Sequence, residues 1–136
     1  MTTKAFFQNI RLQLIEEISA AKQQIVVAVA WFTDKKLFNL LIDKSKEGLD
    51  VQLMITDDEI NRQYGPDFSE LSKYGGTLIM VNGPNPETLM HNKFCIIDGT
   101  TVITGSYNWS KKAASNHENI TITWNNLGLA TQFLTE

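Results

Sequence analysis

The residues best suited to chemistry lie in two short stretches in the second half of the chain. The first stretch holds His91 and Lys93, which are two apart on a predicted strand and therefore point to the same face. An apolar run then leads into an Asp-Gly turn at Asp98, and a second strand returns Ser106 and Asn108 beside them. An imidazole, an ammonium, a hydroxyl and an amide can together hold a phosphate and attack it. The sequence therefore predicts a phosphate-reacting site on this hairpin.

The first eighty residues contain the elements that must support such a hairpin. The hydrophobic pattern predicts, in order, a helix over 6–21 capped by Thr2 or Thr3, a strand over 25–31, a helix from Thr33 or Asp34 to Gly48, a strand over 51–56, a short helix over 67–74 and a strand over 77–81. The acidic run 57–59 is predicted to begin a helix rather than to bind a metal. This alternation of strands and helices implies right-handed crossovers and a largely parallel start to the sheet.

The rest of the chain completes the predicted fold. Residues 82–86 are the strongest loop signal and are expected to face the substrate, residues 98–99 form a turn, 111–115 are helical or irregular, 120–124 form a strand and 127–136 a last helix. We expect one α/β domain over 1–136, an α/β/α sandwich with a central mixed, mostly parallel sheet. The last helix ends without a capping signal, so the chain could be a module of a longer protein.

Composition limits the classes of function. The net charge of −3 is mildly acidic, whereas a sequence-independent nucleic-acid binder is more often basic, so such a role needs a local basic patch. Arg11 and Arg62 are the two arginines, which argues against extensive reading of bases. The single cysteine, Cys95, lies in an apolar strand and is predicted to be a core thiol. No signal peptide or membrane span is apparent, and a cytoplasmic location is expected.

The hairpin motif is similar to that of a known family. His91-x-Lys93-x4-Asp98, followed by Gly105-x-x-Asn108, resembles the HxKxxxxD…GxxN signature of the phospholipase D superfamily, and the resemblance covers nearly the whole chain. The chain looks most like the short, single-motif members, which include bacterial nucleases and cardiolipin hydrolases. The resemblance implies that His91 is the nucleophile and forms a phosphohistidine. Because the acidic residues 57–59 have no clustered His or Cys partners in the sequence, no metal is predicted, and no other cofactor is expected.

The chemistry assigns roles to the surrounding residues. Lys93, Asn108 and Ser106 are expected to supply positive charge and hydrogen-bond donors to the phosphate oxygens. Glu118 is the candidate carboxylate that orients His91. Asp98 lies on the opposite strand face, so a structural role is expected for it.

The number of motifs indicates how the site is completed. A leaving alkoxide needs a proton, which calls for a second histidine, and the family's long members carry two motifs. This chain carries one motif, so a two-fold homodimer is expected to bring two copies of His91 to one phosphate and to complete the sheet and the site. His117, the other histidine, is the weaker alternative for the second role.

The expected substrate is a nucleic acid. Lys111 and Lys112 follow the second strand and are predicted to contact a nucleic-acid backbone. Base stacking is one interpretation of Trp31, Trp109 and Trp124, but core packing is favoured for each, and Trp109 is also predicted to form a wall beneath the site. The favoured function is a metal-independent endonuclease for DNA or RNA, without stable membrane association and with other DNA-processing modules as potential partners. The alternatives are a cardiolipin-type phospholipid phosphodiesterase and an inactive scaffold or binding module.

Overall fold

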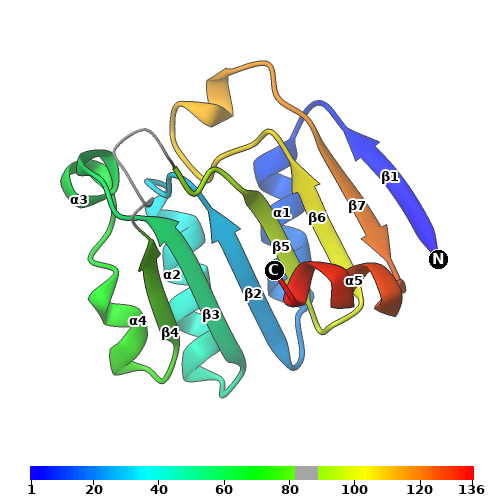
Figure 1. Ribbon diagram of the computed structural model, residues 1–136, viewed down its shortest axis with the longest axis horizontal. Coiled ribbons are helices and arrows are strands. Elements are labelled where there is room, and N and C mark those ends of the chain that lie inside the picture. Colours follow the sequence, from blue (N-terminus) through cyan, green and yellow to red (C-terminus); the bar gives the residue numbers. More distant parts are fainter. Residues whose placement is uncertain (82–88) are drawn as a thin grey trace.

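One mixed sheet runs through the part of the chain that the computed structural model describes, residues 1–81 and 89–136 (Figure 1). Within these residues the strands are β1 (Thr2–Phe6), β2 (Gln24–Val29), β3 (Asp50–Thr56), β4 (Thr77–Val81), β5 (Lys93–Ile97), β6 (Thr101–Gly105) and β7 (Ile120–Trp124). The helices are α1 (Ile10–Ala20), α2 (Lys35–Lys46), α3 (Glu59–Tyr64), α4 (Ser69–Lys73), the short 3-10 turn η1 (Ala113–Ser115) and α5 (Leu127–Leu134). The loop predicted over 82–86 lies outside the described residues.

The strand order is β1-β7-β6-β5-β2-β3-β4. The pairs β2–β3 and β3–β4 are parallel, which confirms the parallel start of the sheet. The remaining pairs, β2–β5, β5–β6, β6–β7 and β1–β7, are antiparallel, so the prediction of a mostly parallel sheet was wrong. The reason is that β5 turns directly into β6 without a crossover helix, and antiparallel pairing is what such a short turn permits.

The N-terminus also differs from the prediction. Residues expected to start a long helix form the edge strand β1, which pairs with β7 and whose Thr3 Oγ1 lies 3.0 Å from Thr123 Oγ1. The helix α1 begins only after Asn9, whose left-handed φ of 56° separates it from the strand. Apolar spacing at Phe6 happened to continue the helical pattern, but hydrogen bonding to β7 decides the conformation of the first residues.

The sequence correctly predicted both ends of α2 and the start of α3. Helix α2 begins after Asp34, whose carboxylate accepts hydrogen bonds from the backbone N–H groups of Lys36 and Leu37. It is followed by Gly48 with a φ of 97°, as predicted for the helix end. Asp58 caps α3 in the same way, so the acidic run does begin a helix. Strands β4 and β7 have the predicted bounds.

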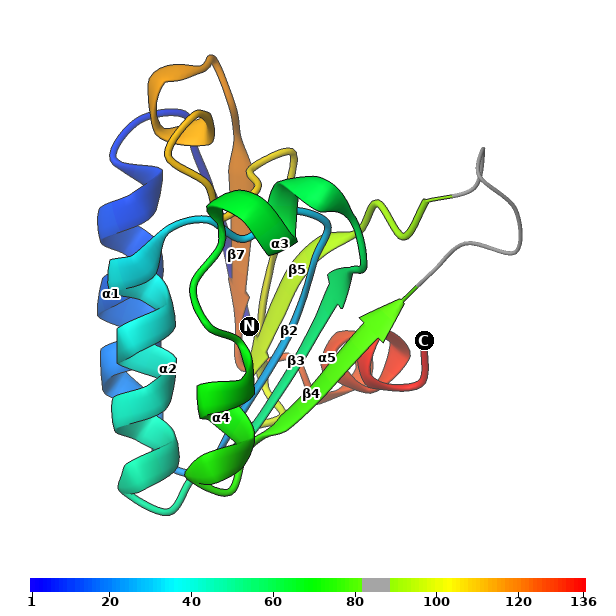
Figure 2. The ribbon, with the colours of Figure 1, turned by 90° about the vertical axis from the view of Figure 1, so that its left-hand side faces the viewer.

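Helices cover the two faces of the sheet unequally, as Figure 2 shows. Helices α1, α2 and α4 lie on one face, and α5 packs against β5 and β6 on the other. The α/β/α layering is therefore present, but the α5 side of β2, β3 and β4 is less covered. Ile79 on β4 is 44% exposed and Met54 on β3 is half-buried there.

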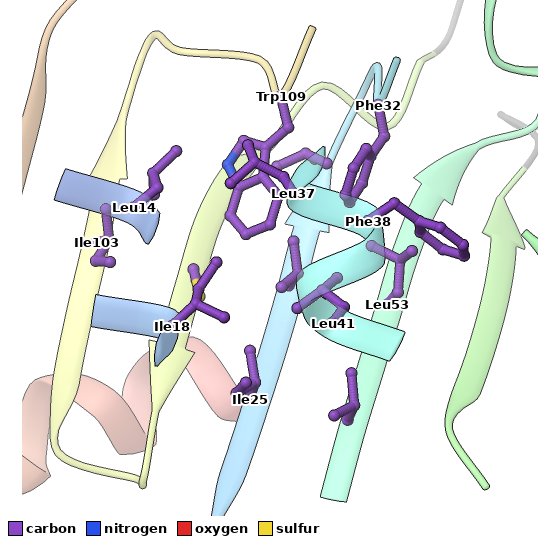
Figure 3. Close-up of a cluster of buried hydrophobic side chains, with 14 of the residues drawn as sticks. Leu14, Ile18, Ile25, Phe32, Leu37, Phe38, Leu41, Leu53, Ile103 and Trp109 are labelled. Atoms are coloured by element: carbon purple, nitrogen blue, oxygen red, sulfur yellow. The ribbon is translucent and has the colours of Figure 1, made fainter. Parts of the chain in front are cut away.

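The main core lies between the sheet and the pair α1 and α2 (Figure 3). Figure 3 shows Ile18 of α1, Leu41 of α2 and Ile25 of β2 within this cluster, and all three are fully buried. Cys95 is 1% exposed within this cluster, and burial raises the pKa of its thiol, as expected of a core cysteine. Burial of these apolar side chains, about 1.5–3 kcal/mol each, holds the strand ends that carry the polar residues described next.

Candidate active site

His91 is held at the ends of the two central parallel strands. The carbonyl of its neighbour Asn92 accepts a hydrogen bond from the N–H of Ala30, at 3.0 Å. On the other side, Thr56 Oγ1 donates to the carbonyl of Met90 at 2.6 Å. Because both partners belong to the ends of β2 and β3, the packed sheet fixes the backbone on either side of His91.

His91 and Lys93 meet although β5 begins only at Lys93. The Nζ atom of Lys93 lies 2.8 Å from Nδ1 and 3.2 Å from Nε2 of His91, so the two side chains do share one face. Half-burial lowers the pKa of Lys93 because it disfavours the ammonium, and the negative charge of Glu118 partly opposes this effect. A ring nitrogen of His91 that carries no proton can accept a hydrogen bond from the Lys93 side chain.

A cavity of about 470 Å³ opens beside this pair. His91, Lys93 and Ser106 line it together with Phe133 and Glu136, which lie at the end of α5 and just beyond it. The hairpin motif therefore places an imidazole, an ammonium and a hydroxyl around one hollow. The last helix supplies its opposite wall.

Gly105 and Ser106 fix the start of the second half of the motif. A side chain at Gly105 would place its Cβ 2.1 Å from the carbonyl oxygen of Asn119, so only glycine fits against this backbone. The N–H of Ser106 donates to that same carbonyl at 3.0 Å, and Ser106 Oγ accepts from the N–H of Asn119 at 3.1 Å. The turn toward Asn108 is therefore set by close contact with the segment before β7.

Asn108 is oriented by Trp31, a contact that the sequence did not predict. Its Oδ1 accepts a hydrogen bond from the N–H of Trp31 at 3.2 Å, which leaves the NH₂ end of the amide as a donor. The ring of Trp31 in turn meets His91 edge to face, with centroids 5.4 Å apart. Trp31 thus contacts both halves of the motif. The one sequence feature that pointed to Trp31 as a site residue is its position directly after the apolar run of β2.

Glu118 does not hydrogen-bond His91 within the described residues. Its carboxylate accepts from Nδ2 of Asn116 at 3.3 Å, and its charge partly opposes the lowering of the pKa of Lys93 by burial. Orientation of His91 by Glu118 stays a prediction. His117 is exposed and lines none of the described cavities.

Asp98 lies at the opposite end of β5 from His91. Its carboxylate accepts hydrogen bonds from the N–H groups of Lys22, Gln23 and Gln24, at 2.8–3.2 Å, and so ties the turn to the start of β2. Burial acts to raise the pKa of Asp98, but these three donors outweigh it and lower the pKa below its ordinary value. Asp98 and Gly99 both have positive φ, as a tight Asp-Gly hairpin turn requires. This arrangement has the form expected of a structural residue.

The residues predicted to contact substrate separate into two groups. Trp109 is 2% exposed and its ring centroid lies 5.2 Å from that of Phe32, so it packs in the core, as favoured, and is not a wall of the cavity. Lys111 and Lys112 are exposed and line a second cavity that Trp31 also borders. Trp124 is half-buried and donates through Nε1 to Glu17 at 3.0 Å.

The described residues, 1–81 and 89–136, hold neither a grouped set of metal ligands nor a membrane-spanning helix. Over these ranges no three His, Cys, Asp or Glu side chains are grouped as a metal site would require. None of the helices in the same ranges has the length and apolar character needed to cross a bilayer. The cytoplasmic location stays a prediction.

Comparison with known proteins assigns the chain to a protein family. Residues 14–136 match the family described as "Cardiolipin synthase, PLD-like domain". The chain therefore belongs to the phospholipase D superfamily, as the hairpin motif indicated.

The similar proteins include enzymes named cardiolipin hydrolase and phospholipase D. A mitochondrial cardiolipin hydrolase from Xenopus laevis is 31% identical over 112 residues, which cover 82% of this chain and 51% of that protein. A phospholipase D from Rickettsia bellii is 27% identical over 110 residues, covering 80% and 53%. The chain thus spans about half the length of the curated relatives it matches.

Two solved structures share the fold over almost their whole length. NucT from Helicobacter pylori superimposes with a TM-score of 0.86 at 22% identity, covering 98% of this chain and 91% of that one. Nuc from Salmonella typhimurium, described as a phospholipase D family member, gives a TM-score of 0.79 at 26% identity, covering 98% and 90%.

Proposed function

We propose that residues 1–136 form one catalytic domain that hydrolyses phosphodiester bonds without a metal, as an endonuclease acting on DNA or RNA. The observation that carries the proposal is the single cavity in which His91, Lys93 and Ser106 meet. The match to the phospholipase D superfamily and the likeness to Nuc support it.

In the first step, a ring nitrogen of His91 attacks the phosphorus atom. A nitrogen–phosphorus bond forms, the bond from phosphorus to the leaving oxygen breaks, and one nucleic-acid fragment stays attached to His91 as a phosphohistidine. Lys93, the Asn108 amide and the Ser106 hydroxyl stabilise the negative charge on the phosphate oxygens that take no part in bond exchange. An incoming phosphate would replace the imidazole as the partner of the Lys93 ammonium.

A second histidine completes the reaction. It donates its proton to the leaving oxygen, then takes a proton from a water molecule that attacks phosphorus and releases His91. In this proposal the second histidine is His91 of a second copy of the chain, so each active site belongs to two subunits.

The lightly covered sheet face is the proposed contact between the copies. Val26, Ala28, Met54 and Ile79 form an apolar hollow of about 200 Å³ there, bordered by Phe133. Phe133 also lines the catalytic cavity, so the two hollows are neighbours on this face. A second copy seated on this face would bury exposed apolar area and bring its own His91 close to the first.

The proposal is tested by incubating the protein with single- and double-stranded DNA and RNA, with and without a chelator. We expect cleavage that persists with chelator and disappears in His91→Ala. His117→Ala, which removes the exposed histidine, is the matched control and should retain activity. Cleavage that stops on chelation, or that survives His91→Ala, would contradict the proposal.

Phospholipid hydrolysis is the second candidate, because the similar proteins include several named mitochondrial cardiolipin hydrolase. Cardiolipin vesicles in the same assay separate the two functions. Release of lipid product, with no cleavage of any nucleic acid, would favour the lipid enzyme. An inactive scaffold is disfavoured because His91, Lys93, Ser106 and Asn108 are all present.

A further inference from the structure

A second hollow, of about 510 Å³, lies beside the catalytic one. Its lining includes Trp31, Ile60 and Tyr64, together with the backbone segment that carries Lys111 and Lys112. The ring of Trp31, which lines this second hollow, meets His91 of the catalytic cavity edge to face, with centroids 5.4 Å apart. This aromatic hollow is not used by the chemistry described above.

The ring of Trp31, which lines the aromatic hollow, is held by a hydrogen bond. Its Nε1 donates a hydrogen bond to Oδ2 of Asp58 at 2.6 Å. The other carboxylate oxygen of Asp58 accepts from the N–H of Asn61 at 3.1 Å, capping α3. One carboxylate therefore sets both the position of the indole and the start of the neighbouring helix.

Helix α3 is anchored by the fully buried Asn61. Its amide donates to the carbonyls of Ala30 and Thr56, at 2.9 and 2.7 Å, and its Oδ1 accepts from the N–H of Phe32 at 2.8 Å. With all of these bonds made, α3 is held against the ends of β2 and β3. This orientation leaves Ile60 and Tyr64, four residues apart on one helix face, 43% and 62% exposed along the aromatic hollow.

Another part of the lining carries positive charge. The N–H of Lys111 donates to Thr33 Oγ1 at 3.2 Å, which ties this part to the segment after β2. The Lys111 and Lys112 side chains are exposed. The aromatic hollow thus combines a fixed indole and a solvent-exposed phenol ring with two ammonium groups at its rim.

A ligand for this hollow needs a flat apolar group and a negative charge close to each other. We propose that it binds an unpaired nucleobase next to the phosphodiester that His91 attacks, with Lys111 and Lys112 contacting the adjoining phosphates. This inference rests on the proposed nuclease function and specifies its substrate as single-stranded nucleic acid. A base in a duplex is stacked and paired, so it must leave the helix before an aromatic side chain can stack on it.

Tyr64 is the residue to change, because Trp31 also contacts His91. Binding of a labelled single strand is measured by fluorescence anisotropy at fixed salt in the His91→Ala background, which keeps the strand intact. Tyr64→Ala is expected to weaken binding about 10-fold, and Tyr64→Phe to restore it. Tyr74→Ala, at a tyrosine 41% exposed on another surface, is the matched control and should bind normally.

The same variants are then tested with a strand of equal length that carries no bases. Because this strand offers no base to stack, Tyr64→Ala and its parent should bind it equally. Equal binding of the base-containing strand by the two proteins would overturn the inference, as would an equal loss for both strands. Loss of affinity for cardiolipin vesicles alone would assign the aromatic hollow to an acyl chain instead.

These outcomes are distinct from failure of the proposed function. A wild-type protein that cleaves no nucleic acid contradicts the nuclease, whatever Tyr64 does. A wild-type protein that cleaves single strands and duplexes equally well, with no effect of Tyr64→Ala, retains the nuclease and removes the base-binding hollow.

Discussion

At the scale of single residues, the charge of Lys93 makes a prediction about pH. Half-burial lowers its pKa from the ordinary 10.5, so the ammonium loses its proton at a lower pH than a surface lysine. Because phosphate binding needs the charged form, we expect kcat/KM to fall on the alkaline side below pH 10.5.

Glu118→Gln tests this assignment. The Glu118 carboxylate raises the pKa of Lys93, so its removal should move the alkaline limb of the kcat/KM profile to lower pH and leave the rate near neutral pH little changed. Glu70→Gln, on α4, is the control. A fall in rate at every pH would instead favour orientation of His91 by Glu118, and an unmoved limb would contradict the account of Lys93.

At the scale of elements, the β5–β6 hairpin is held by Asp98. Its folded-state pKa lies below the ordinary 3.8, so the carboxylate stabilises the fold above that pH, and this stabilisation is lost as pH falls through the lower folded value. Asp98→Asn keeps an acceptor but removes the charge, which should cost about 1 kcal/mol of unfolding free energy at neutral pH.

Urea unfolding at a fixed protein concentration measures this cost. The difference between Asp98→Asn and the wild type should shrink as pH is lowered below 3.8. Asp43→Asn, at an exposed position of α2, should change stability by less than about 0.5 kcal/mol. A loss of stability in Asp98→Asn that does not depend on pH would show that the charge is not what holds the turn.

Elements with local signals were predictable from the sequence. Asp34 marks the start of α2, Gly48 follows its end, and the Asp98-Gly99 pair marks the hairpin, because each acts within a few residues of its own position. The edge strand β1 was not predictable, because its conformation depends on pairing with β7, more than 100 residues away in the chain. His91 and Lys93 are two residues apart, so their spacing was enough to predict that they meet. The contacts of Trp31 could not be predicted in this way, because they arise only once β2 pairs with β5.

At the scale of the whole molecule, the proposed dimer makes a direct prediction. Ile79→Asp places a charge on the exposed apolar face of β4, where burial against a second copy would be unfavourable. We expect this variant to sediment as a monomer and to lose nuclease activity. Leu12→Asp, at a leucine 55% exposed on α1, is the matched control and should remain an active dimer. A wild-type protein that is active as a strict monomer would contradict the shared site.

The central claim is that His91 becomes covalently attached to one fragment of the substrate. The most direct measurement is to quench the reaction with a labelled strand under alkaline denaturing conditions, in which a phosphohistidine persists, and to locate the label by mass spectrometry. The account predicts labelled protein in the wild type and in His117→Ala, with the modification on His91, and none in His91→Ala. Cleavage that proceeds while no label ever appears on His91 would contradict it.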